Sequence, residues 1–90
     1  MATLIRASGE TLEVTPANGK EFTLAELQRF VGGFIELIPA PGGRLMFLDE
    51  DGKRNRKPVN AAATAIVRHW LASDDEIVGD VILCSRAEAT

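Results

Sequence analysis

The sequence predicts an α+β fold: a small mixed or antiparallel sheet with the element order ββαββαβ and two helices packed on one face. Three observations predict it. Short segments alternate polar and apolar residues as strands do, two longer segments hold apolar residues at helical spacing, and turn residues separate them. Hairpins interleaved with helices are typical of this class. One domain is predicted over residues 1–90, with a flexible tail at 86–90.

The chain begins with a predicted hairpin. Residues 3–7 read as a strand, residues 8–10 as a turn, and residues 11–15 as a half-buried strand that alternates polar with apolar side chains. Pro16 cannot donate a backbone hydrogen bond to a neighbouring strand, so the second strand is expected to end there.

The first helix carries both a start signal and a stop signal. Thr23 is placed to cap its N-terminus, and Glu26 follows three residues later, where its carboxylate can reach back to the Thr23 amide. Gly32 and Gly33 end the helix, because glycine adopts the left-handed conformation without steric cost. The helix is expected to present one apolar face and a hydrophobic staple, formed by Phe22, Leu24, Leu27, Phe30 and Val31.

A second hairpin follows, with strands at 34–38 and 44–48 joined by a turn. Both strands carry apolar side chains on both faces of the sheet, whereas helices packed on one face can cover only that face. The other face is therefore expected to be an interface, formed by Phe34, Ile38, Met46 and Leu48. A homo-oligomer, with a dimer favoured, is the preferred explanation. The alternatives are a binding groove for another macromolecule and cover by the N-terminal segment within the monomer.

The second helix is predicted over residues 61–71. Asn60 is a plausible N-cap, the alanine run favours helix, and the apolar residues hold helical spacing. Residues 73–76 break this helix, and residues 77–84 form the last predicted strand, interrupted by Gly79.

Composition excludes several classes of protein. With 46% hydrophobic residues the chain is not expected to be disordered, and a net charge of −3 disfavours nucleic acid as a partner. One cysteine cannot form an internal disulfide, which favours a reducing compartment. The first ten residues lack the long apolar core expected of a signal peptide, and no apolar run approaches membrane-spanning length. The sequence therefore predicts a cytoplasmic protein with no membrane partner.

No catalytic or metal-binding set is predicted, and no cofactor is expected. His69 is the only histidine and has no second metal ligand at a suitable spacing. Cys84 lies in an apolar strand, where a thiol is inert, although a dyad with His69 is conceivable. The acidic runs at 49–51 and 74–76 are interpreted as solvated turns. We therefore predict that the protein is not an enzyme.

The basic loop at residues 53–57 is the best candidate for a ligand site. Four cations precede a helix N-terminus, whose free amides favour anions. The predicted anion-binding residues are Lys53, Arg54, Arg56, Lys57 and Asn60. Against this site, the acidic run at 49–51 can neutralise the loop, and no aromatic residue is present for base stacking. A solvated loop is the competing interpretation.

The chain also resembles a family of small domains of unknown function that bacteriophages, plasmids and bacteria encode. The resemblance lies in the order of short motifs over most of residues 24–83, whereas the basic loop and the alanine-rich helix depart from the pattern. The matching segments are Leu27-Gln28, Val31-Gly32-Gly33, Phe34-Ile35-Glu36, Glu50-Asp51-Gly52-Lys53, Pro58, Asn60 and Ile77-Val78-Gly79. The resemblance implies a mobile-element origin and a role in host takeover or counter-defence, without an assigned reaction.

Two functions follow as expectations. The first is a non-enzymatic interaction module that self-associates and binds a macromolecular partner, for which a protein is possible. The alternative is a protein that sequesters an anionic small molecule, such as a nucleotide, between the basic loop and the second helix.

Overall fold

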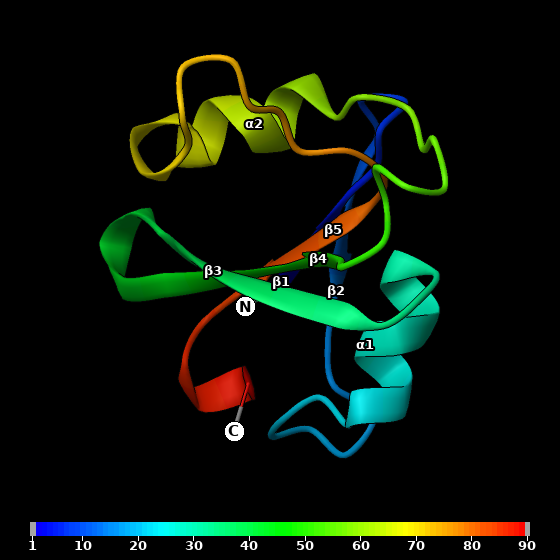
Figure 1. The fold of residues 1–90 in the computed structure, drawn as a ribbon. Coiled ribbons are helices and arrows are strands. Elements are labelled where there is room, and N and C mark those ends of the chain that lie inside the picture. Colours follow the sequence, from blue (N-terminus) through cyan, green and yellow to red (C-terminus); the bar gives the residue numbers. More distant parts are fainter. Residues whose placement is uncertain (1, 90) are drawn as a thin grey trace.

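A computed structural model describes residues 2–89 as a five-stranded antiparallel sheet with a helix on each face (Figure 1). Residues 1 and 90, which the single-domain prediction includes, lie outside the described residues. The strands are β1 (Ala2–Ile5), β2 (Thr11–Val14), β3 (Ile35–Ala40), β4 (Arg44–Asp49) and β5 (Val81–Cys84). The helices are α1 (Leu24–Val31) and α2 (Ala61–Val67), with 3-10 helices η1 (Pro41–Gly43), η2 (Arg68–Trp70) and η3 (Ala87–Ala89).

The α+β class and the element order are confirmed. The sheet order is β2-β1-β5-β4-β3, so both hairpins are present and the last strand inserts between them. The last strand begins at Val81, later than predicted, because Gly79 adopts a positive φ of 77° and turns the chain. Before this turn, Val78 makes only an isolated bridge to Val59.

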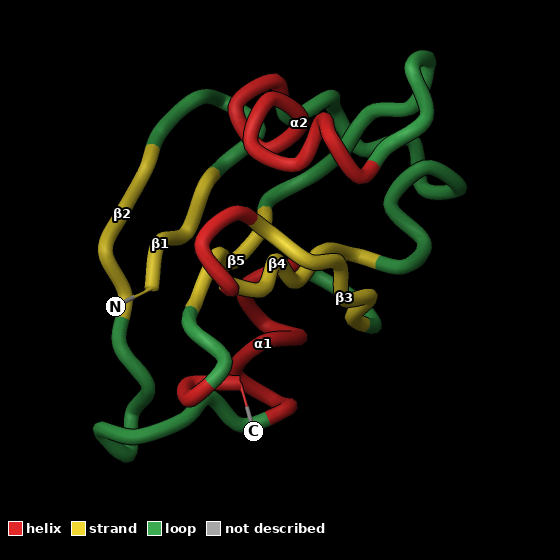
Figure 2. Tube along the Cα trace, turned by 90° about the vertical axis from the view of Figure 1, so that its left-hand side faces the viewer, coloured by secondary structure: helices red, strands yellow, loops and turns green. Residues whose placement is uncertain are grey.

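The two helices lie on opposite faces of the sheet, which corrects the prediction that both pack on one face (Figure 2). The segment with α1 connects β2 to β3 across one face, and the segment with α2 connects β4 to β5 across the other. The α1-side core contains Leu4, Leu27, Val31, Leu45, Phe47, Ile82 and Cys84. The α2-side core contains Ile5, Met46, Leu48, Ala63, Val67, Val81 and Leu83.

This arrangement explains why the middle hairpin is apolar on both sides. Alternate residues of β4 point into opposite cores, so Met46 and Leu48 are buried against α2. Ile38 packs partly buried beside them. The expectation that this sheet face is bare in a single copy is therefore wrong, because α2 already covers it.

The local signals of α1 are present as predicted. Glu26 N donates to Thr23 Oγ1 over 3.2 Å, and Thr23 N donates to Glu26 Oε1 over 2.9 Å, which completes the capping box. Gly32 ends the helix with a φ of 79°. Phe22 and Leu27 are both buried in the α1-side core, as a hydrophobic staple requires.

Two C-terminal segments differ from the expectations. The second helix ends as an α-helix at Val67 and continues as η2, where the Arg68 guanidinium donates to the carbonyls of Ala72 and Asp75. Residues 86–89, expected as a flexible tail, include η3, whose Glu88 carbonyl accepts a 2.7 Å hydrogen bond from Phe22 N. Among residues 2–89, no helix combines the length and the apolar character that crossing a bilayer requires.

Candidate functional site

Three large apolar side chains on α1, on β3 and in the turn between them are exposed. Leu24 is 59% exposed, Phe34 68% and Leu37 50%, although each is large and apolar. We call the surface formed by Leu24, Ala25, Gln28, Phe34 and Leu37 the α1–β3 surface. Among residues 2–89, three other large apolar side chains are exposed, and they lie on other segments: Leu12, Val59 and Trp70.

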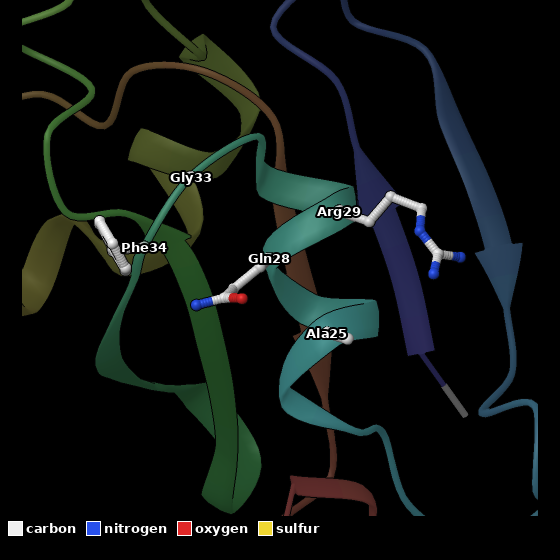
Figure 3. A pocket seen from close by; sticks show the side chains of 5 residues that line it. All are labelled: Ala25, Gln28, Arg29, Gly33 and Phe34. Carbon is white, nitrogen blue, oxygen red and sulfur yellow. The ribbon is translucent and has the colours of Figure 1, made fainter.

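The spacing of α1 places one flank of the helix toward β3. Leu27 and Val31 point into the core, and Leu24 and Gln28 are neighbours one turn apart on the adjoining flank. Figure 3 shows Gln28 pointing from the helix toward Phe34, whereas Arg29 extends away on the opposite side. The flank that carries Leu24 and Gln28 therefore borders β3.

The register of β3 places Leu37 on the same sheet face as α1. Leu37 is the cross-strand partner of Phe47, which belongs to the α1-side core. Partners in an antiparallel pair share a face. However, β3 is the last strand of the sheet, so Leu37 has a neighbouring strand on one side only and stays half exposed.

The free edge of β3 has a defined set of backbone groups. Glu50 N donates to Phe34 O over 2.8 Å, which makes these residues a hydrogen-bonded pair. Because such pairs alternate with non-hydrogen-bonded pairs, the even-numbered residues of β3 bond to β4. Ile35, Leu37 and Pro39 therefore direct their backbone groups outward, and Pro39 has no N–H to offer.

A shallow depression of about 430 Å³ shares Ala25, Gln28 and Phe34 with the α1–β3 surface. Its lining consists of Ala25, Gln28, Arg29, Gly33 and Phe34. The Gln28 amide and the Arg29 guanidinium are its polar side-chain groups, and neither is a nucleophile or a general base at neutral pH. The depression can accommodate an apolar group, but its lining carries no catalytic chemistry.

Most cations of the basic loop are already paired. Lys53 forms an ion pair with Asp75, and Arg54 Nη1 lies 3.6 Å from Asp51 Oδ1. The Lys53 hydrogen bond lowers the pKa of the Asp75 carboxyl. Carboxylates of both acidic runs, 49–51 and 74–76, therefore pair with cations of the loop. Neutralisation by the run at 49–51 was the sequence argument against an anion site.

Lys57 and Asn60 have structural roles at the base of this loop. Lys57 Nζ lies 2.5 Å from Asp49 Oδ2 and donates to Val31 O over 2.9 Å, at the C-terminal end of α1. Asn60 is fully buried, and its amide joins three segments of backbone. Arg56, which has a positive φ of 56°, is the remaining predicted anion ligand. These contacts weigh against an anion site at the basic loop.

The separate glycine motifs meet at Lys57, which the sequence did not reveal. A Cβ on Gly32 would lie 3.0 Å from Lys57 Nζ, and one on Gly79 would lie 2.9 Å from Lys57 Cδ. A Cβ on Gly33 would lie 2.8 Å from Asp49 Oδ1. The glycines therefore make room for the pair that the partly buried Lys57 forms with the buried Asp49. No local sequence signal links these glycines to Lys57, because they lie far from it in the chain and only the fold brings the segments together.

His69 and Cys84 cannot form the conceivable dyad. The Cys84 side chain belongs to the α1-side core, and His69 lies in η2, which follows α2 on the other side of the sheet. Burial raises the pKa of the Cys84 thiol to about 11, and the charge of Glu88 adds to this shift. His69 instead packs edge-on against Trp70. Within residues 2–89, no three His, Cys, Asp or Glu side chains are arranged to hold a metal ion.

Comparison with known proteins gives one match. A family model described as "Domain of unknown function (DUF3846)" matches residues 1–90, the whole chain. No curated protein and no solved structure matches it.

Proposed function

We propose that this chain, which belongs to the family described as Domain of unknown function (DUF3846), is a non-enzymatic interaction module that self-associates through the α1–β3 surface. The observation that carries this proposal is the exposure of Leu24, Phe34 and Leu37 beside a free strand edge. The sequence suggested self-association through a bare sheet face, but α2 covers that face. The exposed α1–β3 surface is therefore a different reason for the same proposal.

Exposure of these side chains is costly in water. Burial of apolar surface contributes about 25 cal/mol per Å², and Phe34 alone leaves two thirds of its side chain exposed. Neither hydrophobic core includes Phe34 or Leu37, so the fold does not require large apolar side chains at these two positions. Adjoining exposed apolar residues of this kind mark interaction surfaces in soluble proteins.

The alternative function, sequestration of an anionic small molecule such as a nucleotide, has less support. Lys53 and Lys57 are engaged by carboxylates, and the Asn60 amide is used up inside the fold. Arg54 is paired with Asp51, and Arg56 lies exposed on the loop. An interaction surface therefore fits the geometry better.

Other parts of the proposal rest on the resemblance and on the cysteine chemistry. An origin in a bacteriophage or another mobile element, a further protein partner, and a role in host takeover or counter-defence follow from the resemblance. The gene neighbourhood of this chain checks them. A cytoplasmic location is supported by Cys84, a buried free thiol that a reducing compartment leaves unpaired.

Sedimentation velocity over a range of protein concentrations tests self-association. We expect the wild-type chain to shift from monomer to dimer as concentration rises, and Leu37→Lys to stay monomeric because it places a charge within the apolar surface. Leu12→Lys is the matched control, since Leu12 is 41% exposed on the edge strand β2, at the opposite end of the sheet. Thermal melts establish that all three chains fold.

The proposal is overturned by a wild-type chain that stays monomeric at every concentration. It is equally overturned if Leu12→Lys abolishes association and Leu37→Lys does not, because the contact would then lie on β2.

A further inference from the structure

We infer that two copies of this chain join by pairing their β3 edges, with Leu37 of one copy opposite Leu37 of the other, into one continuous antiparallel sheet. This inference rests on the proposed self-association and names its geometry. It follows from the backbone groups that β3 directs outward and from the side chains that the pairing would bring together.

The outward groups of β3 are complementary to themselves in this register. The two Leu37 residues exchange two hydrogen bonds, and each Ile35 N–H donates to the carbonyl of Pro39 in the second copy. Every outward N–H then has an acceptor. Pro39, which lacks an N–H, meets Ile35 without leaving a donor unpaired, so the proline does not oppose this register.

Among pairings confined to β3 residues, one other register satisfies the same donors, and charge disfavours it. Pairing Ile35 with Leu37 of the second copy also forms all available bonds, but it sets Glu36 directly opposite Glu36. Like charges opposite one another destabilise an antiparallel pair. In the Leu37-centred register, Glu36 lies opposite Ile38 instead. Registers displaced further toward Pro39 lose hydrogen bonds, because fewer outward groups overlap.

Side chains on the α1 face agree with the same register. Ile35, Leu37 and Pro39 share the face that α1 covers, so the seam there joins only apolar side chains. The symmetry axis of such a pair is perpendicular to the sheet, which places both α1 helices on one side. The flanks that carry Leu24 and Gln28 then face each other across the paired Leu37 residues.

Disulfide trapping under mild oxidation tests the register. Leu37→Cys places two thiols on the symmetry axis, at a strand spacing that a disulfide can bridge. Glu36→Cys reports the competing register, and Leu12→Cys on β2 is the control. The native Cys84 is buried and does not compete. We expect Leu37→Cys to form covalent dimers at least about tenfold faster than either other variant, since its thiols alone meet at bridging distance.

Amide hydrogen exchange of the unmodified chain gives a second readout. The amides of Ile35 and Leu37 are expected to become protected as protein concentration rises, whereas the β2 amides that face solvent are not. Faster trapping by Glu36→Cys overturns the Leu37-centred register. Concentration-dependent association with no trapping at either position and no protection overturns strand pairing but leaves the proposed function intact. A chain that remains monomeric overturns both.

Discussion

Replacement of Asn60 by alanine is the most informative single change, because it separates a structural role from a ligand-binding role. The Asn60 side chain is fully buried. Its Nδ2 donates to Ile5 O over 2.9 Å and to Gly79 O over 2.8 Å, and its Oδ1 accepts from Ala63 N over 3.0 Å. One amide thus ties the end of β1 and the turn before β5 to the start of α2.

The expected cost follows from these three hydrogen bonds. A net contribution of about 1 kcal/mol for each gives about 3 kcal/mol for Asn60→Ala. A domain of this size has a free energy of unfolding of roughly 5–13 kcal/mol, so the loss is a large share. The melting temperature is expected to fall by roughly 12–24 °C.

Chemical denaturation followed by circular dichroism measures the free energy of unfolding. Asn18→Ala is the matched control, because Asn18 Oδ1 accepts from Lys20 N and Glu21 N in an exposed turn, where the loss is expected to stay within about 1 kcal/mol. A second variant, Asn60→Asp, keeps the acceptor but aims a carboxylate at two carbonyls, and it is expected to destabilise at least as much as Asn60→Ala. If Asn60→Ala costs no more than Asn18→Ala, the structural reasoning is refuted.

Two further predictions concern ionised groups. Lys57→Met is expected to lower the free energy of unfolding by about 3 kcal/mol, because it leaves the buried Asp49 carboxylate without its cation. The double variant with Asp49→Asn is expected to recover part of this loss, as measured by denaturant-induced unfolding. Glu26 accepts hydrogen bonds from the backbone amides of Thr23 and Ala17, which lower its pKa in the folded state. A lowered folded pKa stabilises the fold above the unfolded pKa, and this contribution disappears as pH falls through the folded pKa. Glu26→Gln is therefore expected to melt below wild type near neutral pH, with a gap that narrows on acidification.

Each of these predictions has a result that contradicts it. Equal stability of Lys57→Met and wild type would mean that Asp49 is compensated by something other than Lys57. For Glu26, a melting difference that stays constant between about pH 7 and about pH 3 would show that the carboxylate charge is irrelevant to the cap. An NMR titration of the Glu26 carboxyl gives the pKa directly.

Local sequence signals predicted the elements well because they depend on near neighbours. The capping box of α1, the glycine at its C-terminus and the turn residues of both hairpins act within a few residues, so they could be read from the chain. Boundaries were less accurate where tertiary contacts decide them. The second helix ends early as an α-helix, and the last strand begins only after the turn at Gly79.

The candidate site was predicted only in part. The interface was predicted at Phe34, Ile38, Met46 and Leu48. Phe34 is exposed on the α1–β3 surface, whereas Met46 and Leu48 are buried under α2. Leu37 was assigned to the other side of the hairpin and omitted, since the sequence does not reveal that β3 is an edge strand. The pairing of basic-loop cations with distant carboxylates, as between Lys57 and Asp49, could not be predicted from sequence spacing.

The sequence by itself determined the identity and order of the strands and helices, because hydrogen bonding within turns and caps and the period of apolar residues are local properties. Only the tertiary structure decided which sheet face each helix covers, which strand is left at the edge, and which carboxylate each lysine meets. These depend on contacts between residues far apart in the chain, such as Asn60 with Ile5. Because α2 crosses the sheet face opposite α1, Met46 is buried in the core. Leu37 stays exposed because β3 is the edge strand.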